Sequence, residues 1–280
     1  EGLASPNARS VKEWENLHRR MTDSQAPGLA AAIRYLTDEI LNSADDERFA
    51  WEIARLFLVT ESYGRREELD VATRSELAAC IGDGPASADV LASGTIDDEW
   101  FIAGREITER DRLTTSMTWL FGIRSQRWAK ILKFAHAPAT VAEPWPPGNT
   151  VKTGLSFFPG LQPTRALPNA DGEISAPTAP PISDTDFESL LTRHASALAA
   201  NPFLRSSAFL TELFPQGNTR LTDRSDRSLP WSASSEVSFR VQCITGGKAT
   251  LACGEWDGRV IRLLAIADET NWVSLSPFRA

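Results

Sequence analysis

The spacing of apolar residues changes near residue 95, and this change constrains the fold more than any other feature of the 280-residue sequence. Before that point apolar residues recur every three or four positions, which is the period of an α-helix. After it they recur at every second position, which is the period of a β-strand. A chain that uses both periods in separate stretches predicts an α+β fold.

The first ninety residues predict a layer of helices. One begins in "APGLAAAIR", where Pro27 suits the first turn and Gly28 shares a face with Ala31 and Ala32. Because glycine weakens a helix, we expect Gly28 at a close contact with another helix. Further helices are predicted over "DDERFAWEIARLFLVTESYG" and "REELDVATRSELAACIG", and the buried face of the former is predicted to hold Phe49, Ile53, Leu56 and Phe57.

Strands are predicted from residue 95 onward. Three are expected in "EWFIAGREIT", "RLTTSMTWLFGIRS" and "RWAKILKFAHA", and a fourth in "TVKTGLSFFPG". Their short connections imply antiparallel pairing. The stretches 137–149 and 168–183 are rich in Pro, Ala and Gly, so loops or linkers are predicted there.

The last third of the sequence predicts a mixture of helix and strand. "SDTDFESLLTRHASALAAN" has a clear helical period, and "SSEVSFRVQCITGG" could be helix or strand, with helix favoured. At 249–267 we expect a β-hairpin, because Asp257-Gly258 suits a type I′ turn with positive φ at Gly258. The expected order is an N-terminal helical layer (1–90), a central antiparallel sheet (91–170) and a C-terminal helix plus β-hairpin region (171–280), as separate regions or as one compact unit.

Composition narrows the classes of function. The sequence holds 37 acidic and 29 basic residues, and its net charge of −8 argues against nucleic-acid binding by this chain alone. No apolar run approaches ~18 residues, so no membrane span is expected. Three cysteines, an odd and sparse set, suit a reducing compartment, which predicts a cytoplasmic location.

The sequence shows no motif for catalysis, metal binding or cofactor binding. His18, His136 and His194 are isolated, and no C-x-x-C, nucleotide-binding or G-x-S-x-G pattern is present. We therefore expect no enzyme activity, catalytic residue, metal ligand or cofactor. Residues 97–99, all acidic, could supply paired carboxylates or a metal site, but a solvated turn is favoured. "RLTDRSDR" could bind phosphate, but a self-paired hairpin turn is favoured.

Two tryptophans are candidates for contact with a partner. Trp145 lies between prolines in "EPWPPGN", where it could anchor a partner or pack its own loop onto the body. Trp256 precedes the predicted hairpin turn, where it could pack beside the turn or face a partner. Both are predicted as partner-binding residues on that basis.

Four segments, in order, resemble bacterial SWIM zinc-finger family proteins. They are "MTDSQAPGLAAAIR", "IDDEWFIAGREITERDRLTTSMTWLFG", "GLSFFPGLQPTRAL" and "ITGGKATLACGEWDGRVIRLLAI", which together span most of 15–267. The family's zinc motif, C-x-C followed by C-x-H, is not in this sequence, so no zinc ligand carries over. The resemblance places the chain after the finger.

The resemblance implies a non-enzymatic function. It suggests a protein-interaction scaffold or adaptor, with a AAA+ ATPase or a von Willebrand factor A protein as partner, by analogy with the family. One alternative is a nucleic-acid-associated module whose contacts come from an upstream finger. The other is a hydrolase that uses acidic residues such as Asp98.

The charge balance gives a direct prediction for DNA. The chain alone should bind duplex DNA no better than other acidic proteins, because its basic residues are interspersed with acids and few phosphates could be neutralised. A titration of labelled duplex at two salt concentrations, followed by fluorescence anisotropy, measures this. A sub-micromolar, salt-sensitive dissociation constant would instead support the nucleic-acid alternative.

Overall fold

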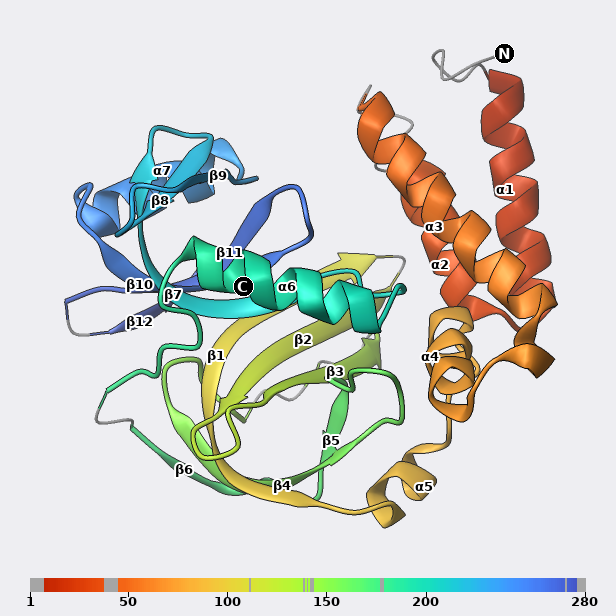
Figure 1. Cartoon of the computed structure of the whole chain (residues 1–280), viewed down its shortest axis with the longest axis horizontal. Coiled ribbons are helices and arrows are strands. Elements are labelled where there is room, and N and C mark those ends of the chain that lie inside the picture. The colour runs from red at the N-terminus through yellow and green to blue at the C-terminus, as the bar shows by residue number, and fades with distance from the viewer. Residues whose placement is uncertain are drawn as a thin grey trace. The chain divides into compact units, whose positions relative to one another are not determined.

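The computed structural model describes residues 8–37, 45–110, 112–137, 139, 141, 144–176, 179–269 and 271–275. Its elements confirm the α+β class and are labelled in Figure 1. The chain forms two compact units. The helical unit comprises 1–86 with 159–161 and 201–203, and the sheet unit comprises 87–158, 162–200 and 204–280. The predicted boundaries near 90 and 170 stay predictions.

The helical unit is built from α1 (Ala8–Asp23), α2 (Pro27–Tyr35), α3 (Asp46–Gly64), a 3-10 turn (Arg66–Glu68) and α4 (Val71–Ile81). The single helix predicted over "REELDVATRSELAACIG" is wrong, because Leu69 and Asp70 are extended and separate the 3-10 turn from α4. The Asp70 carboxylate accepts hydrogen bonds from the backbone N–H groups of Ala72 and Thr73, so it caps the start of α4. Gly82 ends α4 in a left-handed conformation.

The expected role of Gly28 is confirmed. A Cβ at this position would lie 2.2 Å from the carbonyl oxygen of Cys80 and 2.7 Å from the carbonyl carbon of Ile81. The backbones of α2 and α4 therefore meet where the chain has no side chain. Pro27 occupies the first turn of α2, as predicted.

The sheet unit contains two six-stranded sheets, whose strand pairs are antiparallel in the described residues. The first, sheet A, has the order β3-β2-β1-β4-β5 with β6 also on β4, and the second, sheet B, has the order β12-β11-β10-β7-β8-β9. Sheet A holds β1 (Ile96–Arg110), β2 (Leu113–Gly122), β3 (Trp128–His136), β4 (Thr150–Phe157), β5 (Ala166–Pro168) and β6 (Glu173–Ser175). Sheet B holds β7 (Ser207–Gln216), β8 (Arg220–Asp223), β9 (Ser228–Pro230), β10 (Thr250–Trp256), β11 (Ile261–Ala267) and β12 (Trp272–Ser274).

Most sequence expectations for this unit are confirmed. The four predicted strands are β1 to β4, and the ambiguous segment is the helix α7 (Ser235–Thr245). The hairpin is β10 and β11, with φ of 93° at Gly258 as expected. The predicted type I′ turn is wrong, because the loop between Trp256 and Ile261 has four residues and Asp257 does not have the positive φ that this turn requires. The elements that were not predicted include the short helix α5 (Ser87–Ala92), the short strands β5 and β12, and β6, which lies within the stretch predicted as loop at 168–183.

Three apolar clusters hold the sheet unit together. One fills the space between the sheets, with Phe101, Trp119 and Phe121 from sheet A against Leu210 and Leu264 from sheet B. Another lies on the opposite face of sheet A, and the third packs sheet B against α7 and against α6 (Phe187–Ala200), which lies along β7 (Figure 1). No helix in the described residues combines the length and the apolar character that crossing a membrane requires.

The contact at Gly28 predicts a large cost for a small substitution. Gly28→Ala should lower the free energy of unfolding by roughly 1–3 kcal/mol, because the new methyl group must push α4 away. Urea denaturation followed by circular dichroism measures the change. The matched control is Gly64→Ala, where a Cβ would meet nothing within 4 Å. Equal denaturation midpoints for the two variants would refute the packing explanation.

Candidate functional site

The two tryptophans predicted to contact a partner are both buried. Trp145 is 3% exposed and belongs to the apolar cluster on the face of sheet A that is turned away from sheet B. Its indole Nε1 donates to the carbonyl oxygen of Asp171 at 2.7 Å, and its own carbonyl accepts from the Arg105 guanidinium. The ring thus packs the loop between β3 and β4 onto the sheet unit, which is the second of the two roles considered for it.

Trp256 is 6% exposed and packs in a different cluster, with Phe187 and Leu190 of α6. The structure therefore does not bring the two tryptophans together. Their role in partner binding stays a prediction, but neither ring can be reached unless the groups that cover it move.

Asp98 is not in a solvated turn, and that expectation is wrong. The side chain is 2% exposed, while Asp97 and Glu99 on either side are exposed. Its carboxylate accepts from the backbone N–H groups of Glu99, Ser125 and Arg124 at 2.7, 2.8 and 3.2 Å. The Arg124 side chain adds an ion pair at 3.3 Å. Asp98 therefore fixes the turn between β2 and β3 to the start of β1.

This environment controls the protonation of Asp98. Burial alone would raise its pKa, but the hydrogen bonds from Ser125, Arg124 and Glu99 outweigh burial and lower the pKa below the ordinary value of 3.8. The carboxylate is thus an acceptor for the protein's own backbone, and it does not converge with Asp97 or Glu99.

Asp223, in "RLTDRSDR", has the same kind of role. The segment forms the predicted hairpin between β8 and β9. Asp223 is 1% exposed, and its carboxylate accepts from the backbone N–H groups of Phe187, Ser225 and Arg227 at 2.6, 2.9 and 2.9 Å. It joins the hairpin turn to the first residue of α6. The acids in both motifs serve to stabilise loops.

The histidines stay apart from one another. His194, on α6, is buried, and its Nδ1 lies 2.9 Å from the Ser207 hydroxyl oxygen. His18 lies on α1 and His136 at the end of β3. Within the described ranges, no group of three or more His, Cys, Asp or Glu side chains could hold a metal ion.

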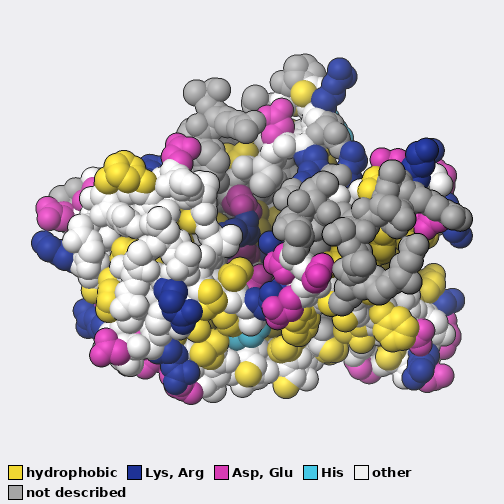
Figure 2. All heavy atoms as spheres, turned by 90° about the horizontal axis from the view of Figure 1, so that it is seen from above, with side chains coloured by type: hydrophobic (Ala, Val, Ile, Leu, Met, Phe, Trp, Pro, Cys, Tyr) yellow, Lys and Arg dark blue, Asp and Glu magenta, His cyan; other side chains and the backbone are white. Residues whose placement is uncertain are grey.

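An exposed apolar surface on α3 is the site that the sequence analysis missed. Phe57 was predicted to be buried, but it is 64% exposed, and Trp51 is 51% exposed. Ala54, also exposed, lies between them at three-residue spacing, so the three share one side of the helix. We call Trp51, Ala54 and Phe57 the α3 outer face. The space-filling view likewise shows hydrophobic side chains at the surface, among charged ones (Figure 2).

The opposite side of α3 packs inside the helical unit. Phe49, Ile53 and Leu56, predicted to be buried, are half-buried, and Phe49 makes an edge-on contact with Trp14 of α1, at 6.4 Å between ring centroids. A helix with apolar residues on both sides normally has both sides covered. The sequence did contain evidence for this second apolar surface. Around the helix axis, Trp51 and Phe57 lie outside the arc that Phe49, Ile53 and Leu56 occupy.

The helices of this unit are similar to a known domain family. Residues 1–81 match the model of the SWIM-associated four-helix bundle domain. The helices α1 to α4 all lie inside the match, which ends at Ile81, the last residue of α4. The SWIM resemblance is confirmed for these residues, and the chain is consistent with a region of a SWIM-family protein. No curated protein and no solved structure matches the chain.

The Asp98 geometry predicts a pH-dependent contribution to stability. Its folded pKa is depressed, so its contribution is complete above the ordinary value of 3.8 and is lost as the pH falls through the lower folded value. Asp98→Asn should therefore cost about 1–3 kcal/mol at pH 7, because an amide NH₂ cannot accept from the backbone. The cost should shrink toward pH 2.

Denaturation midpoints of wild type and variant across this range test the prediction. Asp97→Asn is the matched control, because its side chain is exposed. A deficit of the same size at every pH would show that Asp98 acts through its shape and not through its charge.

Proposed function

We propose that the chain is a non-enzymatic scaffold or adaptor of a SWIM-type protein, and that the α3 outer face of the SWIM-associated domain is its contact with a protein partner. The observation that carries the proposal is the exposure of Trp51 and Phe57 on the same side of one helix. Aromatic side chains are enriched in protein interfaces, and tryptophan is enriched among the residues that contribute most to binding.

The energetics favour a covered state of this surface. Full burial of one large apolar side chain is worth roughly 1.5–3 kcal/mol. Two such aromatics on neighbouring turns therefore provide enough free energy to anchor a modest interface. The rest of α3 is already packed on α1 and α4, so the surface can be covered without rearrangement of the domain.

The absence of catalysis is part of the proposal. The hydrolase alternative depended on Asp98, whose carboxylate is occupied by three backbone N–H groups and the Arg124 side chain. The acid in the second motif, Asp223, is occupied in the same way. Acids used in this manner are poor candidates for general acid or base catalysis, which needs a carboxylate directed at a substrate.

The partner class comes from the family resemblance and from the chemistry of the surface. The family's association with AAA+ ATPases and von Willebrand factor A proteins makes these the first candidates, and we propose a cytoplasmic setting for the complex. Nucleic acid fits the surface less well, because Glu47 and Glu61 lie on the same side of α3 as Ala54.

The proposal predicts that partner capture depends on α3. The full-length protein should be purified from its native host by affinity tag, as wild type and as the Trp51→Ala and Phe57→Ala variants, and the bound proteins compared by quantitative mass spectrometry. Each variant should lose an AAA+ or von Willebrand factor A protein by at least about tenfold, since a hot spot is worth ≥2 kcal/mol.

The control is Phe239→Ala on α7, which removes an equally exposed aromatic side chain, 70% exposed, from the other unit. It should leave capture unchanged. The same set of captured proteins from wild type and from both α3 variants would contradict the proposal.

A further inference from the structure

A cavity of about 350 Å³ lies within the sheet unit, where β2 and β3 approach α6 and the start of β7. Its apolar lining includes Trp119, Trp128 and Ala197. This volume is that of a pocket for a small ligand or a single large side chain. None of the sequence motifs indicated this cavity, because its lining residues come from five separate segments.

The charge of the lining is opposite to that of the chain. Arg127 and Arg193 line the cavity, and no Asp or Glu is among the described residues that do so. The whole sequence carries a net charge of −8. A pocket with two guanidinium groups and no carboxylate in an acidic protein selects for an anion.

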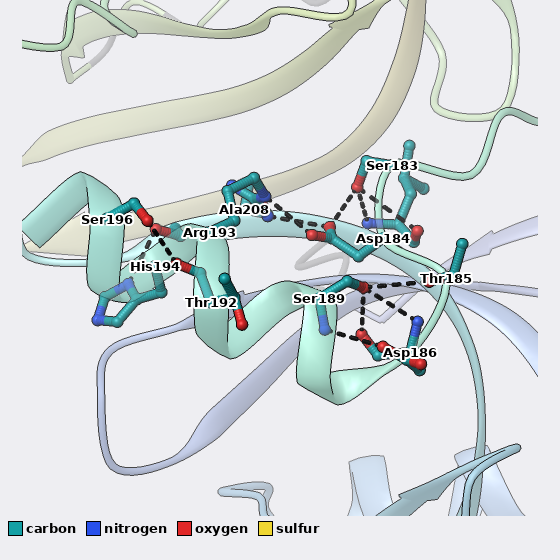
Figure 3. Close-up of polar contacts among 12 residues, drawn as sticks. Ser183, Asp184, Thr185, Asp186, Ser189, Thr192, Arg193, His194, Ser196 and Ala208 are labelled. Atoms are coloured by element: carbon teal, nitrogen blue, oxygen red, sulfur yellow. Dashed lines mark hydrogen bonds and ion pairs between the residues drawn. The ribbon is translucent and has the colours of Figure 1, made fainter.

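Arg193 is held in a fixed orientation. Its Nε and Nη2 donate to the two carboxylate oxygens of Asp184 at 2.8 and 2.9 Å, and Nη2 also donates to the carbonyl oxygen of Ala208 at 2.6 Å (Figure 3). These bonds leave Nη1 without a hydrogen bond in the described part of the chain. A donor held in this way binds a ligand with little loss of side-chain entropy.

Arg127 has no carboxylate partner among the described residues. Its guanidinium lies over the ring of Phe157, 4.4 Å from the centroid. Such a contact is worth only about 0.5–1 kcal/mol at an accessible site. Because Asp184 already neutralises Arg193, Arg127 is the lining charge that remains to be balanced.

The two tryptophans that line the cavity, Trp119 and Trp128, are also held in fixed positions. The rings of Trp119 and Trp128 meet edge to face, 5.9 Å apart and at 89°. The Nε1 of Trp119 donates to Glu255 Oε1 at 2.8 Å, and the Ser206 hydroxyl, also in the lining, donates to the same oxygen at 3.3 Å. The Nε1 of Trp128 is buried with no hydrogen-bond partner in the described residues.

We infer that this cavity binds a carboxylate carried on a flat apolar group, with the carboxylate beside Arg127 and Nη1 of Arg193 and the apolar group against Trp119 and Trp128. A single negative charge fits better than a phosphate dianion. Of the α6 residues that line the cavity, Ser196 and Ala197 lie in the second half of a helix that ends at Ala200, where the helix dipole is negative. The inference stands independently of the α3 outer face.

Isothermal titration calorimetry on the whole chain tests the inference with two matched pairs of probes. The first pair is 3-phenylpropanoate and its neutral amide. The second is a short peptide ending in phenylalanine, with a free or an amidated C-terminus. At least one acid should bind with 1:1 stoichiometry and a dissociation constant of about 1 mM or tighter, and at least about tenfold more tightly than its amide.

The two pairs distinguish the source of the carboxylate. Binding of the free acid alone indicates a small-molecule ligand, and binding of the peptide acid alone indicates the C-terminus of a partner protein. Either result supports the inference. Failure of both acids to bind saturably, or equal binding of acid and amide, would overturn it.

Variants locate the binding in the cavity. Arg127→Gln should weaken binding of the acid by about tenfold or more, because it removes the unbalanced charge. Ser196→Trp, at an exposed lining position, should block the cavity even if Arg127→Gln fails to fold. Arg240→Gln on α7 is the control, an exposed arginine outside the lining, and should bind as wild type does. Unaltered affinity in folded Arg127→Gln or in Ser196→Trp would also overturn the inference.

Discussion

The hydrogen bond between Trp119 of β2 and Glu255 of β10 joins the two sheets of the larger unit, and the rest of that unit is arranged around it. Glu255 is 7% exposed, so its charge must be compensated inside the protein. Arg262 of β11 supplies the compensation and also pairs with Glu106 of β1, which makes a second connection between the sheets. Burial alone would lower the pKa of Arg262, but the carboxylates of Glu255 and Glu106 raise this pKa above its ordinary value. Burial, together with the same Glu255, raises the pKa of the Cys253 thiol, which packs as an apolar group.

The sequence predicted local structure well because local structure depends on nearby residues. The alternation in β1 to β4, the turn at Gly258 and the contact at Gly28 all follow from short-range patterns and are all present. The sequence could not predict that β10 pairs with β7 or that Glu255 pairs with Trp119. Alternation of apolar and polar residues indicates a strand but does not determine which other strand it pairs with. Trp145 shows the same limit: its Pro-rich surroundings suggested a loop, but only the fold shows that the ring enters the core.

The candidate sites were harder to predict than the fold. The acidic motifs were considered as binding sites because Asp98 and Asp223 have charged neighbours in the sequence. In the structure, both carboxylates accept hydrogen bonds from the backbone of turns. The α3 outer face escaped notice because one apolar arc had already been assigned to that helix. The cavity beside Trp119 could not be found from sequence at all, since its lining is assembled from β2, the β2–β3 turn, the start of β3, the loop 162–164, α6 and the start of β7.

The long separation between Trp119 and Glu255 also bears on how the protein is made. These residues are 136 positions apart, so β2 leaves the ribosome well before the strand that covers it. At about 5–20 residues per second, β2 waits roughly 7–27 seconds for β10. Until the strands of sheet B are made, Phe101, Trp119 and Phe121 have no opposing sheet, and an uncovered apolar sheet is prone to aggregate. During its synthesis, therefore, the chain has a period of vulnerability whose length is set by the distance in sequence between its two sheets.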